Sequence, residues 1–283
     1  MGRAHGRPVR GLQGREKRDM PTKTAVFLDL DGTLWEWGVV PDSAREAIRR
    51  AQANGHKVLT NTGRARSEVP DLTYLGLNGF CFAAGAEVIL DGKTIVDEPL
   101  GEERLRAVAR VFDSFGLNYS LESGEGSWLC INDQAAFDKL LDMVGGTPDP
   151  IFYTPHVCDM PPEQWGQIHK TFYHGGGPVY EQVAAAMPEG VVLTDLGPGF
   201  AEATAAGVNK ATAMEAVRTW LGADEWRTMA CGDSDNDLTM LRAADVSVAM
   251  GNGNDNAKAA ATWVTTDIHD DGLLNAFAHY GLI

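Results

Sequence analysis

Two aspartates, Asp29 and Asp31, follow an apolar run at residues 25–28 and come just before Gly32 and Thr33. The run has no polar alternation, which is typical of a buried parallel strand. Because strand side chains alternate between two faces, we expect both carboxylates on the same side. Two carboxylates that close repel each other unless a cation or a shared proton separates them. A solvated Asp-Gly turn is the alternative for this segment taken alone.

A second polar segment, Thr62-Gly63-Arg64, follows a predicted strand at residues 56–59. A hydroxyl group, backbone N–H donors and a guanidinium fork suit a bound anion. A simple turn from strand to helix is the alternative.

Further charged side chains stand late in the chain. Asp233 and Asp237 follow a predicted strand at residues 226–231, and Lys210 begins a predicted helix. A small number of hard oxygen ligands in a crevice that handles phosphate suits Mg²⁺, which keeps several of its waters. Lys210 is able to neutralise charge that develops there, whereas Asp237 could instead only cap its own helix.

The elements that must position these residues alternate between strand and helix. Strands are predicted at residues 25–28, 56–59 and 79–84. A helix is predicted between the first two, and a short helix interrupted near Pro70 between the second and third; the alternation resumes near Gly197. This pattern predicts an α/β fold with a Rossmann-like, doubly wound parallel sheet. Ligands of such sheets bind beyond the carboxyl ends of the strands.

Residues 87–196 show a different pattern. Strands and helices follow one another there without regular alternation, which predicts an inserted α+β module. We therefore expect a core formed by residues 24–86 and 197–283, with the inserted domain at residues 87–196. The spacing of His156, His169 and His174 matches no metal motif, which favours packing or surface roles.

Charge is unevenly distributed along the 283 residues. Residues 1–23 carry seven Lys or Arg and two acids, or +5, so a total of −15 leaves −20 for the rest. Such an acidic body is poorly suited to nonspecific nucleic-acid binding, and we expect no nucleic-acid partner. The basic leader at residues 1–23 lacks the apolar segment of a secretory signal, and we interpret it as a tag or as sequence preceding a true start at Met20.

No segment approaches the ~20 apolar residues of a membrane-spanning helix, so no membrane partner is expected. Paired spacing is absent among the four cysteines, Cys81, Cys130, Cys158 and Cys231. This usage is typical of reduced thiols rather than of a zinc site, and we expect a cytoplasmic protein.

Taken together, the motifs resemble those of the haloacid dehalogenase (HAD) superfamily of phosphohydrolases, in its Cof-like subgroup with a large α/β (type IIB) cap. Four motifs carry the resemblance: Asp29-Leu-Asp31-Gly-Thr33, Thr62-Gly-Arg64, Lys210 and Gly232-Asp-x-x-Asn236-Asp237. Val248-Ala-Met-Gly-Asn252 and Asp271-Gly272 also follow the subgroup's pattern. The resemblance covers the predicted core and implies that the inserted module is a cap that sets substrate specificity.

The resemblance implies catalytic roles for the acidic residues. Asp29 would be the nucleophile that forms an aspartyl-phosphate, and Asp31 would protonate the leaving alkoxide and later activate water. Mg²⁺ would be held by Asp29, by the backbone carbonyl of Asp31 and by Asp233. Asp237 would orient Lys210 or a metal-bound water from behind.

The same resemblance implies a set of residues that grip the phosphoryl oxygens, namely Thr62, Gly63, Lys210 and Asn236. Arg64 would contact the substrate. One position departs from the subgroup: Ala84-Gly85-Ala86 stands where Asn-Gly-Ala is common. A polar contact to the substrate or the phosphate pocket is therefore missing.

We accordingly expect an Mg²⁺-dependent phosphatase of a small phosphorylated metabolite, with a sugar phosphate suggested by the family alone. Asp31 argues against a hydrolytic dehalogenase, which needs no acid two residues after its nucleophile. A phosphomutase and a non-catalytic binding protein stay open, although the latter would be expected to have lost Asp29, Asp31 or Lys210. Either a monomer or a homodimer fits these observations.

Overall fold

The computed structural model describes residues 23–283, apart from residues 37, 144–159, 176 and 178. The predicted basic leader, except for Lys23, and the positions of His156 and Cys158 lie outside the described residues.

The central strand of the larger sheet is β1 (Lys23–Leu28), which is buried on both faces. Ala25 and Phe27 belong to one apolar cluster, and Val26 and Leu28 to another. Because both faces are covered, the strand needs no polar alternation, which explains the pattern in the sequence.

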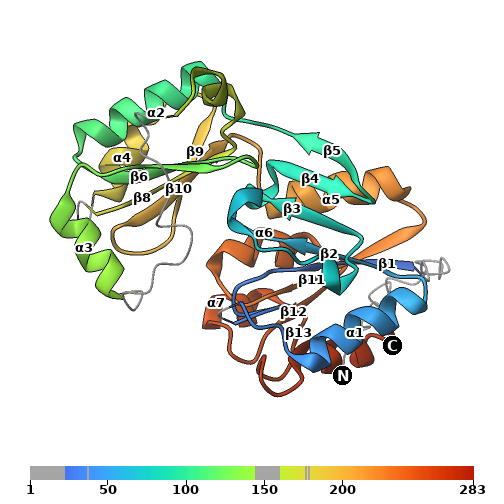
Figure 1. Ribbon diagram of the computed structural model, residues 1–283. Helices are drawn as coiled ribbons and strands as arrows, with labels where there is room; N and C mark the ends of the chain where they lie inside the picture. Colours follow the sequence, from blue (N-terminus) through green and yellow to red (C-terminus); the bar gives the residue numbers. More distant parts are fainter. Residues whose placement is uncertain (1–22, 37, 144–159, 176, 178) are drawn as a thin grey trace, which may run out of the picture.

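Eight strands form this sheet, in the order β13-β12-β11-β1-β2-β3-β4-β5 (Figure 1). The strands from β13 to β3 are parallel, and β4 and β5 extend the sheet as antiparallel neighbours of β3. Their bounds are Lys57–Asn61 (β2), Gly79–Phe82 (β3), Glu87–Leu90 (β4), Lys93–Asp97 (β5), Trp226–Gly232 (β11), Val246–Ala249 (β12) and Trp263–Val264 (β13).

Helices cover both faces of the sheet. The cluster that contains Val26 includes side chains of α1 (Asp42–Ala53) and α8 (Gly272–His279). On the opposite face the cluster that contains Phe27 includes side chains from three other helices, α5 (Lys210–Leu221), α6 (Leu238–Ala243) and α7 (Asp255–Ala260). The predicted doubly wound α/β core is thus confirmed.

The second part of the molecule is a five-stranded antiparallel sheet in the order β7-β6-β8-β10-β9. Its helix α2 (Glu102–Ser114) packs on one face, where Phe112 contacts the rings of Tyr119 and Tyr173. The remaining elements are Asn118–Glu122 (β6), Ser127–Cys130 (β7), Gln134–Met143 (α3), Lys170–His174 (β8), Tyr180–Ala186 (α4), Val191–Asp195 (β9) and Phe200–Ala205 (β10). We call this part the cap.

Both domain boundaries expected from the sequence disagree with the way in which the strands are divided between the two sheets. The hairpin β4–β5, predicted as the start of the inserted domain, continues the core sheet, and β10, predicted as core, pairs with β8 and β9 in the cap. The sequence reveals a hairpin by its Asp-Gly turn but not the sheet edge that it joins. Strand β10 escaped prediction because Phe200–Ala205 contains no apolar run.

Two smaller expectations were also wrong. The third predicted strand ends at Phe82 rather than at residue 84, because Ala83 and Ala84 adopt positive φ angles of 48° and 56°. The helix expected between the second and third strands is replaced by short 3-10 turns at Arg66–Glu68 and Thr73–Leu75. In the part of the chain that the structure describes, no helix is long and apolar enough to cross a membrane.

Candidate active site

The predicted site residues meet at one edge of the core sheet. Asp29 comes directly after β1 and Asp233 directly after β11, and these parallel neighbours pair Leu28 with Cys231. The backbone N–H of Asp29 donates to the carbonyl of Cys231 at 3.0 Å, which continues the strand pairing to the site. Thr62 follows β2, the neighbour of β1 on the other side. Parallel pairing therefore collects the three chain segments at the carboxyl ends of their strands.

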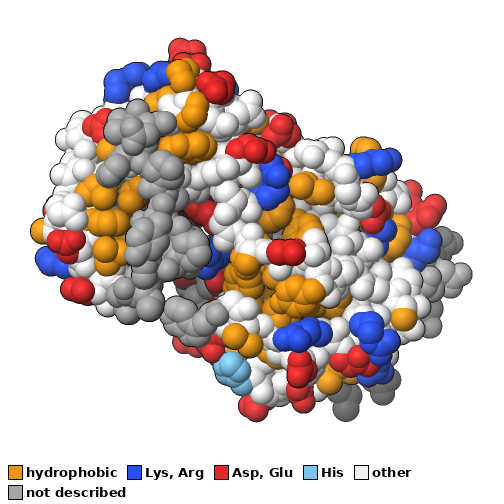
Figure 2. All heavy atoms as spheres, viewed as in Figure 1, with side chains coloured by type: hydrophobic (Ala, Val, Ile, Leu, Met, Phe, Trp, Pro, Cys, Tyr) orange, Lys and Arg blue, Asp and Glu red, His pale blue; other side chains and the backbone are white. Residues whose placement is uncertain are grey.

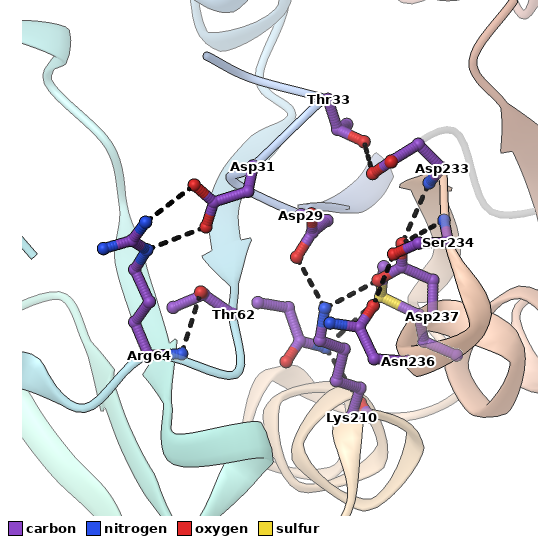
Figure 3. Close-up of polar contacts among 12 residues, drawn as sticks. Asp29, Asp31, Thr33, Thr62, Arg64, Lys210, Asp233, Ser234, Asn236 and Asp237 are labelled. Atoms are coloured by element: carbon purple, nitrogen blue, oxygen red, sulfur yellow. Dashed lines mark hydrogen bonds and ion pairs between the residues drawn. The ribbon is translucent and has the colours of Figure 1, made fainter. Parts of the chain in front are cut away.

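Lys210 lies at the centre of this edge (Figure 3). It is the first residue of α5 and is 1% exposed, and its Nζ lies 2.5 Å from Asp29 Oδ1 and 2.6 Å from Asp237 Oδ1. Burial by itself would lower the pKa of Lys210, but the two carboxylates raise it. The start of α5 is held by Asn209, whose side chain accepts from two backbone N–H groups of the first turn. The lysine is therefore a fixed positive charge beside Asp29.

Asp237 holds other groups in place. Its Oδ2 accepts from the backbone N–H groups of Asp233, at 2.9 Å, and of Ser234, at 3.2 Å, while its Oδ1 accepts from Lys210. Gly232 makes room for this carboxylate, since a Cβ at Gly232 would lie 2.6 Å from Asp237 atoms. This geometry suits the expected role of orienting Lys210 from behind.

Three carboxylates gather where a cation is expected. One side-chain oxygen from each of Asp29, Asp233 and Asp237 lies within 4.8 Å of the others. Burial raises the pKa of Asp29 well above its usual range, and Asp237 and Asp233 add to the rise while Lys210 opposes it. Burial and Asp237 likewise raise the pKa of Asp233 to about 6. The single positive charge of Lys210 is thus too little for this acidic cluster, and the donor set fits a divalent cation.

The side chain of Asp31 points away from this cluster (Figure 3). Its two oxygens accept from Arg64 Nε at 2.8 Å and Nη2 at 2.9 Å, and Trp35 Nε1 donates to Oδ1 at 2.9 Å. Burial would raise the pKa of Asp31, but the hydrogen bonds and charge of Arg64 lower it overall. Asp31 therefore does not join the acidic side-chain cluster, and its carboxylate is ionised in this arrangement.

Three of the predicted phosphate-binding residues, Thr62, Gly63 and Asn236, line the cavity beside Asp29, whereas Lys210 is buried and is not part of the lining. Thr62 is 1% exposed, and its Oγ1 accepts from the backbone N–H of Arg64 at 3.1 Å. A Cβ atom added at Gly63 would lie 3.9 Å from Asn236 Nδ2 and 3.7 Å from Glu202 Oε2. The loop that contains Gly63 therefore lies close to Asn236 and to Glu202 of the cap. At the position where this chain has Ala84 instead of the subgroup's common Asn, the backbone N–H of Ala84 donates to the carbonyl of Thr62 at 2.9 Å.

The cap lies over this edge, and a cavity of about 310 Å³ lies between the two. Ser67 Oγ donates to the carbonyl of Ser123 at 2.6 Å, and Ser127 Oγ donates to Glu68 Oε1 at 3.0 Å, which joins the core loop to the cap. Figure 2 shows a hollow where the two parts meet, with acidic and basic side chains beside it. A cap in this position limits the access of water to a reacting group.

Several cavity residues that come from the strands of the cap were not predicted as site residues from the sequence. They are polar or charged side chains on neighbouring strands, namely Ser120, Glu122, Lys170, His174 and Glu202. The available signal was the polar residues at alternate positions of β6, Asn118, Ser120 and Glu122, which would have indicated one polar sheet face. His174, expected to have a packing or surface role, is buried and lines the cavity, while His169 lies 2.7 Å from Asp97.

Comparison with known proteins agrees with the site. A family model described as haloacid dehalogenase-like hydrolase matches residues 26–277. The chain belongs to this family. The resemblance inferred from the motifs is thereby confirmed.

Relatives of similar length are phosphatases. The 5-amino-6-(5-phospho-D-ribitylamino)uracil phosphatase of Bacillus subtilis (strain 168) is 26% identical over 273 residues, which cover 94% of this chain and 99% of that protein. The chain also spans 54% of a longer Streptococcus pyogenes protein described as joining a phosphatase to a peptidyl-prolyl cis-trans isomerase, with 26% identity over 267 residues.

Solved structures agree with the fold of both parts. A phosphatase of the haloalkanoate (HAD) superfamily from Bacteroides thetaiotaomicron has a TM-score of 0.81 and 27% identity, covering 96% of this chain and all (100%) of that one. A HAD subclass IIB sugar phosphatase has a TM-score of 0.76 and 25% identity, covering 92% of this chain and 100% of that one. The family match and these relatives together identify the protein as a phosphoric monoester hydrolase that acts on a small phosphorylated compound.

Proposed function

We propose that this HAD-like enzyme hydrolyses a sugar or polyol phosphate with Asp29 as its nucleophile and Mg²⁺ as its cofactor. The observation that carries the proposal is the buried carboxylate of Asp29, fixed by Lys210 on the floor of a cavity that the cap covers. The named substrates of the relatives, a sugar phosphate and a phosphoribitylamino compound, support this substrate class.

The metal would be held by the carboxylates of Asp29 and Asp233 and by the backbone carbonyl of Asp31. Asp237 is less suited to direct ligation because Lys210 and two backbone N–H groups already occupy its oxygens. When bound, Mg²⁺ supplies positive charge that orients the phosphoryl group and screens it from the Asp29 carboxylate.

In the first step, Asp29 attacks phosphorus, so an Asp29 O–P bond forms as the bond from phosphorus to the leaving oxygen breaks. Lys210 neutralises charge on the phosphoryl oxygens, with Thr62, Gly63 and Asn236 as hydrogen-bond donors beside it. Asp31 protonates the leaving alkoxide, which requires that its ion pair with Arg64 opens and that it takes up a proton. In the second step, Asp31 removes a proton from the water that attacks phosphorus, the Asp29 O–P bond breaks, and inorganic phosphate leaves with the Asp29 carboxylate restored.

The experiment that tests this proposal measures phosphate release from a panel of phosphate esters by the purified protein. We expect release with Mg²⁺, none in excess EDTA, and none from Asp29→Asn under either condition. Asp224→Asn is the matched control, because Asp224 is exposed and lies before β11, at the sheet edge opposite the site. Full activity in EDTA or in Asp29→Asn contradicts the proposal.

The same assay tests the alternative that the sequence left open, a phosphomutase with the same residues. It would return the phosphoryl group to the organic product, whereas a phosphatase releases one phosphate for each ester consumed. For location we infer the cytoplasm, because Cys81 and Cys231 are buried free thiols. A monomer or a homodimer is our expectation for the assembly.

A further inference from the structure

The face of the cap sheet that lines the cavity is polar, whereas α2 packs on the other face. Strand register places Glu122 of β6 directly beside Lys170 of β8, and Ser120 beside Phe172. Glu202 of β10 pairs with Phe172 on the other side. Because side chains two residues apart share a face, these residues all stand on one side of the sheet. The alternate positions Tyr119, Leu121 and Tyr173 belong to the apolar cluster of α2.

The only cation of this face that borders the cavity, among the described residues, is already neutralised. Lys170 Nζ lies 2.9 Å from Glu122 Oε2 and 3.5 Å from Glu202 Oε2, and all three side chains are less than 10% exposed. Burial would lower the pKa of Lys170, but the two carboxylates raise it. The lysine is therefore engaged by two acids and does not present a free charge to an anion in the cavity.

A further acid strengthens the negative character of this region. Glu68, from the core loop, also lines the cavity, and its pKa rises to about 7 because of burial and the nearby Glu122 carboxylate. The group of Glu68, Glu122, Lys170 and Glu202 thus carries between one and two net negative charges at neutral pH.

Two further features place polar atoms where a ligand in the cavity would contact them. His174 is 4% exposed and lines the cavity, and its Nε2 has no hydrogen-bond partner among the residues that the structure describes. Burial lowers the pKa of His174 to about 4, so the ring is neutral. Glu202 lies beside Gly63, which brings its carboxylate close to the predicted phosphate grip. Buried polar atoms of this kind are costly unless a ligand or water satisfies them.

We propose that Glu122, Lys170, His174 and Glu202 form the leaving-group subsite, and that it selects uncharged or cationic leaving groups with hydroxyl or ammonium donors over leaving groups that carry a second anion. This inference rests on the proposed phosphatase function. The carboxylates accept from hydroxyl or ammonium groups, whereas a carboxylate or second phosphate that faces them meets like charge. Arg64, the other cation among the described residues that line the cavity, is paired with Asp31 at the phosphate end of the cavity. The apolar side chains of Leu129, Phe137 and Leu140 on the cavity wall suit the carbon skeleton of such a leaving group.

The test compares three six-carbon phosphates that differ in charge: glucose 6-phosphate, glucosamine 6-phosphate and 6-phosphogluconate. Each is measured as a substrate and as a competitive inhibitor of p-nitrophenyl phosphate hydrolysis with Mg²⁺. We expect kcat/KM, or 1/Ki for a compound that is not turned over, to be at least ~10-fold lower for 6-phosphogluconate than for the other two. A preference for glucosamine 6-phosphate over glucose 6-phosphate would identify ammonium rather than hydroxyl donors as the better ligands.

The variant Glu202→Gln removes one acid and frees part of the charge of Lys170. This variant should raise the ratio of kcat/KM (or of 1/Ki) for 6-phosphogluconate to that for glucose 6-phosphate by about 5-fold or more. Glu122→Gln provides the same test if Glu202→Gln does not fold. Glu181→Gln is the matched control, because Glu181 is exposed on α4, in the same domain but outside the cavity lining. Equal values for the three compounds, a preference for 6-phosphogluconate, or an unchanged ratio in a folded variant overturns the inference. Absence of p-nitrophenyl phosphate hydrolysis would instead contradict the proposed function.

Discussion

Replacement of Lys210 by methionine should destabilise the protein strongly, although methionine has a similar length. Lys210 is 1% exposed and lies between Asp29 and Asp237, which are 3% and 0% exposed. Without the ammonium group, two buried carboxylates and the neighbouring Asp233 have no cationic partner. Removal of one partner from a buried ion pair costs about 3–5 kcal/mol. At ~2–4 °C per kcal/mol for a protein of this size, the melting temperature should fall by roughly 6–20 °C in EDTA.

The matched control is Lys57→Met, which removes a pair of similar length near the surface. Lys57 Nζ lies 2.8 Å from Asp91, but the two side chains are 21% and 51% exposed. Exposed pairs contribute about 0–1 kcal/mol, so this variant should lose only a few degrees. Both changes remove one lysine charge, so the difference between their losses of stability reports the effect of burial.

The loss in Lys210→Met should also depend on pH and on metal. A proton on Asp29 removes the uncompensated charge, so the difference from the wild type should be smaller at pH 5 than at pH 8. Mg²⁺ should restore part of the stability by replacing the missing positive charge. Thermal melts of both variants and the wild type in EDTA and in Mg²⁺ provide the measurement. Similar losses for the two variants, or a loss in Lys210→Met that is the same at both pH values, would refute this reasoning.

Three further predictions concern the acid, the metal and the cap. Asp31→Asn should slow the first step for an alkyl phosphate by ~10²- to 10⁴-fold but much less for p-nitrophenyl phosphate, because nitrophenolate leaves without a proton; rapid-quench experiments should show a burst of about one equivalent of nitrophenol, and equal losses for both leaving groups would assign the acid role elsewhere. Because the pKa of Asp233 is about 6 without metal, raised from 3.8, and the pKa of Asp29 is also raised, the apparent Mg²⁺ affinity measured by calorimetry should weaken at least about tenfold from pH 7 to pH 5. In EDTA, the contribution of Asp233 to the free energy of unfolding should be fully present below about pH 3.8 and should be lost as the pH rises through about 6. A Mg²⁺ affinity unchanged between pH 7 and pH 5 would argue against Asp233 as a ligand. Replacement of residues 100–206 by a short Gly-Ser linker should leave a folded core that hydrolyses p-nitrophenyl phosphate without ranking natural esters, and a retained ranking would place specificity in the core.

The last of these variants depends on a boundary that the sequence did not reveal. A deletion at the predicted limits of the insertion, residues 87–196, would remove β4 and β5 from the core sheet and leave β10 without its partners. The hairpin turn and the alternation of residues are local properties, whereas the sheet edge that a hairpin joins depends on hydrogen bonds to a distant strand.

The sequence by itself determined the core fold and the central site residues. Asp29 and Asp233 each follow an apolar strand, and parallel strands place their carboxyl ends at one sheet edge whatever the detailed packing. The position of Lys210 at a helix start is equally local, because Asn209 caps that helix through its own first turn. Residue type and spacing were therefore sufficient for these positions.

Only the tertiary structure decided what surrounds that site. Pairing of Asp31 with Arg64 depends on how two loops approach each other, and contact between Lys170 and its acids depends on the register of three cap strands. A shift of one residue in any of those strands would turn its side chains to the opposite face. Register is set by long-range pairing and by burial of the apolar face against α2, which no short segment encodes. The local sequence thus specified the residues that we propose to act on the phosphate, and the packing of distant strands specified the residues that we propose to face the leaving group.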